Sequence, residues 1–525
     1  MINKKIALRS AIVAAALAPA MTMASGYKIN EQSAAGMGTA HAGRAAMAED
    51  ASVVFYNPAA MTQLDRAQIS GGFTYINGYG DFEGNGTNAA GETITGAQDA
   101  DPYDNGGNFL GEKFIPFFYY ANPVSDKLAF GLGVYTPFGT ETNYDESFVG
   151  GGFADKTSLI SLELQPSVAY QINDQLSIGG GLDIVYMEGT LSKFVDSVPY
   201  SATADAGYDA VFAGAKAQGA DDATAAAAAE AQVGYTANSP VLDPANAGFE
   251  GHYEVNGDDW GVGWNIALFY ELSEATNLGF TYRSEIDVDL EGDSEFRNNS
   301  LAVYNPGTGA TPADDSVTTY PVRNQASKVP LTTPQSATLS LTHQATDKLM
   351  LQAGATWTGW SSFEYFDILA TENVASPTDP TGGLADGQLD ISDVSAQNGL
   401  GEGYIGHIVE KWEDVWAVAV GGTYQLNDRI KLRTGYAYDQ SPVTDEYRTA
   451  RVPSSDRQWF TLGMNYAVNN DFSFDIAAAH LLMYPMDLNE VNKGLDDQPT
   501  DSKASVNGEY EIDVFGLSVQ ANYRF

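Results

Sequence analysis

The feature that most constrains this chain is the alternation of short and long connections between segments of alternating polar and apolar residues. The six short connections are rich in Asn and Asp, which is typical of tight β-hairpins. Short turns on one side of a membrane and long loops on the other are the pattern of an outer-membrane barrel. The short connections lie at 122–126, 173–175, 273–276, 345–347, 427–428 and 469–471, and the long ones at 81–113, 140–156, 194–247, 292–331, 371–413, 440–455 and 485–510.

This order predicts an all-β membrane protein, a fourteen-stranded antiparallel transmembrane β-barrel over residues 67–525. Fourteen strands have thirteen connections, six short and seven long if both chain ends lie on the side of the short turns, and an even number of strands is the rule in bacteria. The expected strands are 67–80, 114–121, 127–139, 157–172, 175–193, 248–271, 275–291, 332–344, 348–370, 414–425, 428–439, 456–468, 471–484 and 511–525.

The last expected strand alternates most clearly. One face is apolar and suits lipid, whereas the other is polar and suits a lumen. A soluble β-sandwich also alternates, but it rarely ends on an aromatic edge residue. A C-terminal strand that ends in Phe resembles the signal by which the barrel-assembly machinery recognises its clients. The apolar face is Phe515, Leu517, Val519, Ala521, Tyr523 and Phe525, and the polar face is Gly516, Ser518, Gln520, Asn522 and Arg524.

A second strand supports the same orientation. In 428–439, Leu432 and Tyr436 share one face, whereas Lys431 and Arg433 share the other. Because basic side chains that point at lipid are costly, we expect these two to face the lumen.

Residues 1–24 are predicted to be a secretory signal peptide. Lys4, Lys5 and Arg9 form its positive region, an apolar run follows at 11–17, and Thr22 and Ala24 are the small residues before a cleavage site. No later segment reaches the length of a transmembrane helix. We therefore expect an exported protein of the bacterial outer membrane.

Charge and composition exclude several functions. The formal net charge of −42 argues against a nucleic-acid partner. The chain has no cysteine, so disulfides, thiol catalysis and thiolate metal sites are excluded. The acidic stretch 386–393 lacks the spacing of an EF-hand loop, so we expect no specific metal and no cofactor. The alternative is that this acidic stretch binds Ca²⁺ and so bridges to lipopolysaccharide.

Residues 25–66 do not alternate and are rich in small residues, which indicates short helical turns. The side chains of an eight-stranded barrel fill its interior, whereas a barrel of sixteen to eighteen strands encloses a water channel. A fourteen-stranded barrel lies between these cases and leaves a lumen that must be closed. We expect this segment to fold back into the lumen as a small N-terminal hatch, because its apolar content is too high for a disordered tail. The alanine-rich stretch 202–233 has strong helix propensity and predicts a helical part of loop 194–247.

Several blocks resemble the FadL family of outer-membrane long-chain fatty acid and hydrocarbon transporters. The resemblance covers essentially the whole chain after residue 24, and the motif Asn57-Pro58-Ala59 marks the family. The matching blocks are GYKINEQSAAGMGTAHAGRAAMAEDASVVFYNPAAMTQL (26–64), WGVGWNIALFYELSEATNLGFTYRSEIDVDLEG (260–292), LRTGYAYDQSPV (432–443) and SSDRQWFTLGMNYAVN (454–469).

The resemblance implies passive uptake of a hydrophobic small molecule. Substrate would move from a groove between extracellular loops to a pocket near the mature N-terminus. A hatch movement would then let it leave sideways into the outer-membrane lipid through an inward kink of the third strand. Glycine and proline weaken strand pairing, although glycines here can also serve tight packing. The candidate exit residues are Gly131, Gly133, Pro137 and Gly139.

The resemblance also implies site residues. Pro58 biases Asn57 towards extended geometry, and the Asn57 side chain can hold a turn, which suits a latch. A fatty acid carboxylate in a tunnel of low dielectric constant needs a basic partner. The candidate substrate-binding residues are Tyr27 near the mature N-terminus and the basic residues Lys193, Arg448 and Arg457, although each basic residue could instead be paired with an acid at the rim.

One departure leaves the substrate open. The segment WSSFEYFDILAT (360–371) lacks a lysine that the family pattern would supply there, so uptake of neutral alkanes or aromatic hydrocarbons is the alternative. A general porin needs no apolar hatch. An outer-membrane hydrolase is disfavoured because no histidine forms a recognisable dyad with a neighbouring serine. The histidines are His41, His252, His343, His407 and His480.

Overall fold

A computed structural model describes residues 26–88, 91, 93–94, 105–195, 202–233, 251–297, 300–305, 316–372, 389–392, 400–401, 403–500 and 502–525. The expected signal peptide (1–24) and parts of five expected loops lie outside these residues. Within the described residues, no helix is long and apolar enough to cross a membrane.

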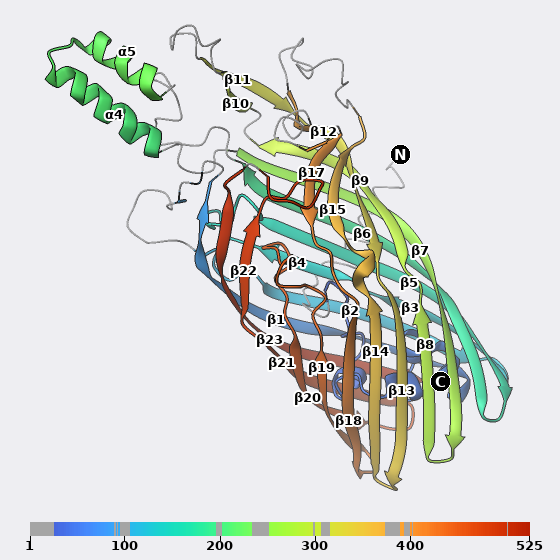
Figure 1. Cartoon of the computed structure of the whole chain (residues 1–525). Helices are drawn as coiled ribbons and strands as arrows, with labels where there is room; N and C mark the ends of the chain where they lie inside the picture. The colour runs from blue at the N-terminus through green and yellow to red at the C-terminus, as the bar shows by residue number, and fades with distance from the viewer. Residues whose placement is uncertain are drawn as a thin grey trace.

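Fourteen antiparallel spans form one closed β-barrel, which confirms the predicted fold class (Figure 1). The barrel closes where the first strand pairs with the last, from Gln68 opposite Arg524 to Thr87 opposite Ser505. The spans are β1 (Gln68–Thr87), β2 (Gly111–Pro123), β3 (Leu128–Tyr135) with β4 (Gly139–Asn143), β5 (Lys156–Asn173), β6 (Leu176–Val195), β7 (Gly251–Ser273), β8 (Thr276–Arg283) with β9 (Ile286–Arg297), β12 (Gln325–Thr333) with β13 (Gln335–Thr346), β14 (Leu349–Gly359) with β15 (Tyr365–Ala370), β17 (Tyr404–Val409) with β18 (Val415–Asn427), β19 (Ile430–Asp439), β20 (Arg457–Ala467), β21 (Phe472–Met483) with β22 (Met486–Val491), and β23 (Ser505–Arg524).

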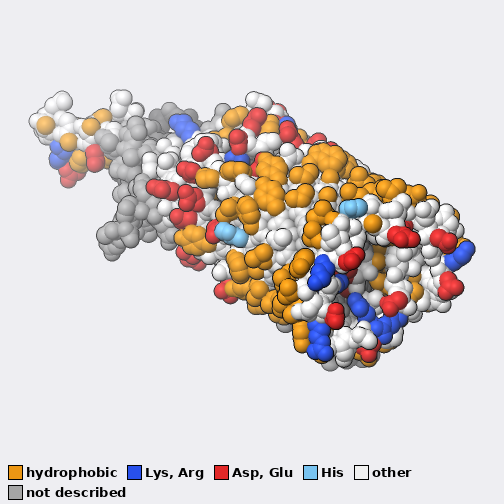
Figure 2. Space-filling view, turned by 90° about the horizontal axis from the view of Figure 1, so that it is seen from below, with side chains coloured by type: hydrophobic (Ala, Val, Ile, Leu, Met, Phe, Trp, Pro, Cys, Tyr) orange, Lys and Arg blue, Asp and Glu red, His pale blue; other side chains and the backbone are white. Residues whose placement is uncertain are grey.

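The expected faces are found on the strands. On β23, Phe515 and Tyr523 are exposed, whereas Ser518, Gln520 and Asn522 are buried. Figure 2 shows apolar side chains over much of the outer surface of the barrel wall, as a membrane-embedded wall requires. On β19, Lys431 and Arg433 point inward, and both pair with Glu49 of the N-terminal segment.

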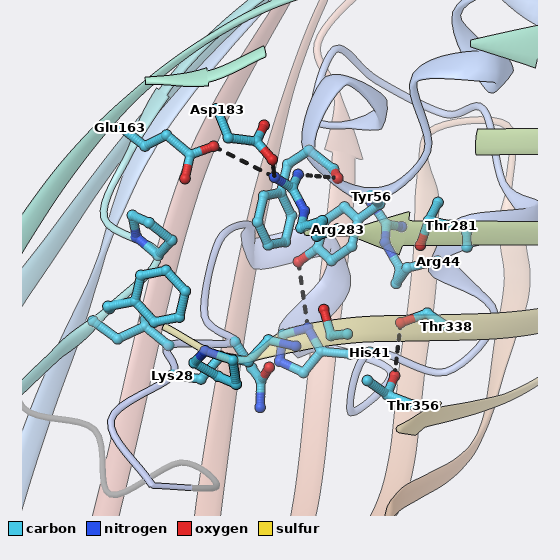
Figure 3. A pocket seen from close by; sticks show the side chains of 18 of the residues that line it. Lys28, His41, Arg44, Tyr56, Glu163, Asp183, Thr281, Arg283, Thr338 and Thr356 are labelled. Atoms are coloured by element: carbon cyan, nitrogen blue, oxygen red, sulfur yellow. Dashed lines mark hydrogen bonds and ion pairs between the residues drawn. The ribbon is translucent and has the colours of Figure 1, made fainter. Parts of the chain in front are cut away.

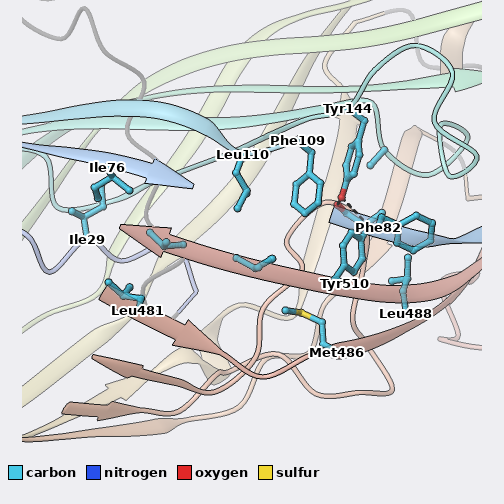
Figure 4. Packing of buried hydrophobic residues seen from close by; sticks show 14 of the residues in the cluster. Ile29, Ile76, Phe82, Phe109, Leu110, Tyr144, Leu481, Met486, Leu488 and Tyr510 are labelled. Carbon is cyan, nitrogen blue, oxygen red and sulfur yellow. Dashed lines mark hydrogen bonds between the residues drawn. The ribbon is translucent and has the colours of Figure 1, made fainter. Parts of the chain in front are cut away.

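The strands continue further towards the extracellular end than predicted. The segments assigned to loops include the outer end of β1, β12 and β23, and also β17 and β22. Beyond the membrane, outward residues such as Asp81 and Glu509 are charged, so the alternation that marks a lipid-facing strand is lost. The strands stay paired because their inner faces share a core. Figure 4 shows this cluster, which includes Phe82, Phe109, Tyr144, Leu488 and Tyr510.

The remaining elements lie in the long connections. The alanine-rich stretch is helical, as predicted, and forms two helices, α4 (Ala202–Ala217) and α5 (Asp222–Val233), with Gly219 between them at a φ of +92°. A small three-stranded sheet contains β10 (Ser300–Asn305), β11 (Ser316–Arg323) and β16 (Leu389–Asp390). A short 3-10 helix, η6 (Trp360–Ser362), separates β14 from β15.

Residues 26–66, the N-terminal segment, lie among the barrel strands as short helical turns (Figure 1). These turns are α2 (Ala34–Met37), η1 (Arg44–Ala46), α3 (Val53–Tyr56) and η2 (Pro58–Gln63). Helix α2 contacts β20, β21 and β23, η1 contacts β8 and β13, and η2 contacts β5 and β6. The segment therefore reaches across the lumen. Glycines in the wall make room for it. A Cβ at Gly279 would lie 1.8 Å from the Ala45 carbonyl oxygen, and one at Gly435 would lie 2.1 Å from the Thr39 carbonyl carbon.

Candidate functional site: a break in strand pairing backed by a cationic cavity

The third span is interrupted, whereas the sequence predicted one strand over 127–139. It breaks at residues 136–138 because Pro137 has no backbone N–H to donate to a ladder. The ladder between β2 and β3 ends at Phe117 opposite Tyr135. The next backbone bond between these two spans runs from the Asn143 N–H to the Phe109 carbonyl, at 2.9 Å.

Between these two limits, residues 110–116 and 136–142 form what we term the window. Within the stretch 105–195, all of which is described, no backbone hydrogen bond joins the two sides of this window. Seven residues in extended conformation span about 23 Å at ~3.3 Å per residue. The outer part of the third span stays in the wall, because β4 pairs with β5 from Gly139 opposite Ile160 to Asn143 opposite Lys156.

The start of the N-terminal segment pairs with the interrupted strand. The Ile29 N–H donates to the Pro137 carbonyl, and the Gly139 N–H donates to the Tyr27 carbonyl, both at 2.8 Å. The Gln32 side chain donates to the Thr136 carbonyl. Tyr27 and Ile29 therefore supply backbone partners at the break, and Gln32 supplies a side-chain partner, where β2 supplies no backbone bond.

Tyr27 is buried in an aromatic cluster at the outer end of this contact. Its ring packs against those of Phe138, Trp360, Phe363 and Trp412, with centroids 4.6–6.0 Å apart. Its hydroxyl donates to the Thr332 carbonyl at 3.2 Å. The cluster offers an apolar surface beside the break in the third span.

A cavity of about 110 Å³ lies directly behind the break (Figure 3). Its lining includes Pro137 and Phe138 from the third span, and Lys28, His41 and Arg44 from the N-terminal segment. The cavity is thus bounded by both the N-terminal segment and the barrel wall. Burial lowers the pKa of His41 to about 3, so its imidazole is neutral at physiological pH.

The cations around this cavity differ in their pairing. Arg283 bridges Glu163 and Asp183, with nitrogen–oxygen distances of 3.4 and 3.1 Å, as Figure 3 shows. Arg44 lies 3.6 Å from Glu49 and 3.8 Å from Asp50.

Lys28 has no ion-pair partner among the described residues. Burial, with a further contribution from Arg283, lowers the pKa of Lys28 to about 8. It is therefore the described cation of this cavity that has no carboxylate within ion-pair distance, which leaves its ammonium available to an anionic ligand at neutral pH.

The three candidate basic residues have different surroundings in the structure. Arg457 is fully buried, and its Nε lies 3.3 Å from Asp439, while its terminal nitrogens have no hydrogen-bond partner among the described residues. Asp439 also acts electrostatically on Lys28, so Arg457 and Lys28 share one neighbouring carboxylate.

The other two predicted cations have different surroundings. Arg448 uses its three guanidinium nitrogens within the outer loops, on the carbonyls of Ser454 and Asp487 and the carboxylate of Asp445. Lys193 interacts electrostatically with Arg451 and Glu490. No described contact joins any two of Lys193, Arg448 and Arg457.

The Asn57-Pro58-Ala59 motif lies at the wall. The Asn57 amide donates to the carbonyls of Ala45 and Leu268, and its oxygen accepts from the Ala59 N–H at 3.0 Å. Pro58 begins η2. Because Leu268 belongs to β7, the motif ties the N-terminal segment to the barrel.

Two of the predicted exit glycines make close contacts. A Cβ at Gly131 would lie 2.5 Å from the Met61 sulfur, so this glycine makes room for η2. A Cβ at Gly133 would lie 2.9 Å from the Tyr135 ring. Gly131 therefore serves packing against the N-terminal segment, and the break itself lies at 136–138.

Sequence reasoning missed Lys28 and Arg283, although a signal for each was present. Lys28 follows Tyr27 within the quoted hatch block, where basic residues are few. Arg283 shares the face of Gly279 and Thr281 on an alternating strand, which places it in the lumen. Arg283 is neutralised by partners on β5 and β6, and no local pattern reveals those partners.

Comparison with known proteins identifies the family. The sequence profile of the outer membrane protein transport proteins (OMPP1/FadL/TodX) matches residues 15–525. The chain is 26% identical over 500 residues to the long-chain fatty acid transport protein of Escherichia coli K12, covering 93% of this chain and 95% of that protein. It is 28% identical over 522 residues to outer membrane protein P1 of Haemophilus influenzae, covering 97% and 98%.

A solved structure agrees in fold. The crystal structure of a Pseudomonas aeruginosa FadL homologue superimposes with a TM-score of 0.70 at 23% identity, covering 95% of this chain and 100% of that one. Fourteen spans, an apolar outer wall and a profile match over nearly the whole chain lead to one conclusion. The chain belongs to the OMPP1/FadL/TodX family of outer-membrane transport proteins.

Proposed function

We propose that this transporter of hydrophobic compounds carries long-chain fatty acids, and that Lys28 and Arg457 bind their carboxylate. The observation that carries the proposal is the unpaired ammonium of Lys28 on a cavity behind the break in the barrel wall. A charged donor to a carboxylate contributes roughly 1.5–3 kcal/mol. The aromatic cluster around Tyr27 would hold the first part of the alkyl chain.

We further propose that the N-terminal segment acts as a hatch. Backbone bonds from Tyr27 and Ile29 and a side-chain bond from Gln32 occupy the interrupted strand. For substrate to pass from the cavity to the window, these bonds must break, and the substrate then leaves sideways into the outer-membrane lipid. Asn57 would keep the rest of the segment on the wall while its first residues move.

The outer cations have different proposed roles. Lys193 would attract the carboxylate at the extracellular end, since it lies near Arg451 among the outer strands. Arg448 would hold the loop that bears it, because all its nitrogens are already engaged. Lipopolysaccharide around the wall and the barrel-assembly machinery during biogenesis are the expected partners.

Uptake of neutral hydrocarbons is the second candidate. It is favoured by the cluster of Tyr27, Trp360, Phe363 and Trp412, which binds apolar surface without any need for charge.

A binding comparison separates the two candidates. A fatty acid and an alkane of equal length are titrated against the wild type, Lys28→Gln, Arg457→Gln and the exposed turn control Lys127→Gln. We expect each of the first two variants to weaken fatty acid binding by about tenfold to a hundredfold and to leave alkane binding unchanged. Equal weakening of both ligands, or of neither, would contradict recognition of the carboxylate.

A further inference from the structure

The window holds a second cation, and it lies outside the cavity described above. Lys113 on β2 and Glu141 on β4 face each other across the window, with 3.0 Å between Nζ and the carboxylate oxygen. Their side chains are only 9% and 13% exposed. Among the described residues, this is the one ion pair that joins the two sides of the window. It therefore ties together two strands that no backbone bond joins.

The surroundings of Lys113 are apolar. It lies on the inner face of β2 together with Ile115, and it pairs across the strand with Ile76, both of which are buried. The next residue, Phe114, is exposed on the outer face among other aromatic rings. A buried ion pair in such surroundings is costly to split, because each charge would remain without compensation.

We propose that Lys113 is a second carboxylate-binding site, which receives a long-chain carboxylate as it leaves through the window. An ammonium group has three N–H donors, and Glu141 is the only hydrogen-bond partner of the Lys113 ammonium among the described residues. A substrate carboxylate can therefore bind beside Glu141. Two like charges on one ammonium repel each other, so the arrival of the substrate weakens the Lys113–Glu141 tie and loosens β4 from β2.

This inference rests on the proposed function, since it presumes lateral exit of a fatty acid. It adds that exit is selective at the wall. A neutral hydrocarbon brings no charge to Lys113 and cannot weaken the ion pair, so it passes only when the pair opens by itself.

The test uses Lys113→Met, Glu141→Gln and the control Lys127→Met, each checked for a heat-modifiable barrel. Initial uptake of a fatty acid and of an alkane of equal length is measured in cells, together with fatty acid binding to the purified protein. We expect Lys113→Met to lower fatty acid uptake by about tenfold and not to lower alkane uptake. Binding within the barrel should stay unchanged, and Glu141→Gln should raise alkane uptake. If Lys113→Met fails to assemble, Lys113→Gln takes its place. If Lys113→Met slows both substrates equally, or neither, the site is overturned.

A cross-link distinguishes this failure from failure of lateral exit itself. Because the chain has no cysteine, Lys113→Cys with Glu141→Cys introduces the protein's two thiols, and a short bismaleimide can join them without a competing reaction elsewhere in the chain. If the joined protein still takes up both substrates at the rate of the unjoined double variant, substrate does not leave through the window, and both proposals fail. If joining blocks uptake while Lys113→Met has no selective effect, lateral exit stands and only the Lys113 site is wrong.

Discussion

The substitution Asn57→Ala tests whether the Asn57 side chain keeps the N-terminal segment, the proposed hatch, docked on the barrel wall without contributing to the stability of the barrel. The side chain makes three hydrogen bonds, of which one, to the Leu268 carbonyl at 2.9 Å, joins the N-terminal segment to the wall. A buried group left without its partner costs about 1–3 kcal/mol. The wall contact alone should thus raise the undocked population of the segment by roughly fivefold to a hundredfold, at about 1.4 kcal/mol per factor of ten. The fourteen-strand pairing involves none of these bonds.

The assay uses a thiol probe at a buried position of the segment. Ala60→Cys is fully buried in the docked state, and no other thiol is present. We expect Asn57→Ala to increase its labelling rate by at least about fivefold and to slow fatty acid uptake, while the barrel stays heat-modifiable. Gln63→Ala is the matched control, because among the described residues the Gln63 side chain bonds only to Thr62 of the same segment. Loss of the folded barrel would make the motif structural, and unchanged labelling would refute the latch.

Three further predictions concern the cavity and the wall. Fatty acid binding should weaken as the pH rises through about 8, the pKa of Lys28, because the neutral amine no longer attracts a carboxylate; alkane binding, measured over the same range, should stay flat. Gly133→Trp should block uptake while equilibrium binding persists, because the added ring must displace Tyr135 beside the break; uptake at the normal rate would place the exit elsewhere. Gly279→Val should lower the yield of assembled protein with a docked segment, because its Cβ would overlap the Ala45 carbonyl; normal yield and normal protease resistance of residues 26–66 would show that the segment adjusts.

The barrel could be predicted because lipid imposes a local rule. Where a strand contacts lipid, its outward residues are apolar and alternate with polar residues that face the lumen. On β23 this alternation, with Phe515 outward and Gln520 inward, can be recognised in the sequence of the strand itself. Above the membrane that rule no longer applies. The outer ends of β1 and β23 are held by inner contacts such as Phe82 with Tyr510, which are far apart in sequence. Contacts between residues so far apart in sequence produce no periodic pattern within either strand, so the sequence did not predict these strand ends.

The site could be predicted only in part for a related reason. Local chemistry and the resemblance pointed to Asn57 and Pro58, whose role as a latch stays a prediction, and to an irregular third span, which the structure shows as the interruption between β3 and β4. The break lies at Pro137, which has no N–H to donate to a ladder, whereas Gly131 lies on β3 and makes room for Met61 of the N-terminal segment. The ion pair of Lys113 with Glu141 joins two different spans across a gap. The partners of Arg283 likewise lie on other strands, so tertiary pairing decides which cations are free.

The central claim is that residues 27–29 must leave the third span for substrate to pass. Lys28 and Phe138 form an antiparallel bridge of the non-hydrogen-bonded kind, in which Cα atoms lie about 4.5 Å apart, within the range of a disulfide. Lys28→Cys with Phe138→Cys should therefore form one in this cysteine-free chain. We expect the oxidised protein to assemble normally and to take up almost no alkane, and the same protein to recover alkane uptake on reduction, because the alkane does not need the ammonium of Lys28. Equal uptake in the oxidised and reduced forms would contradict the movement of the hatch.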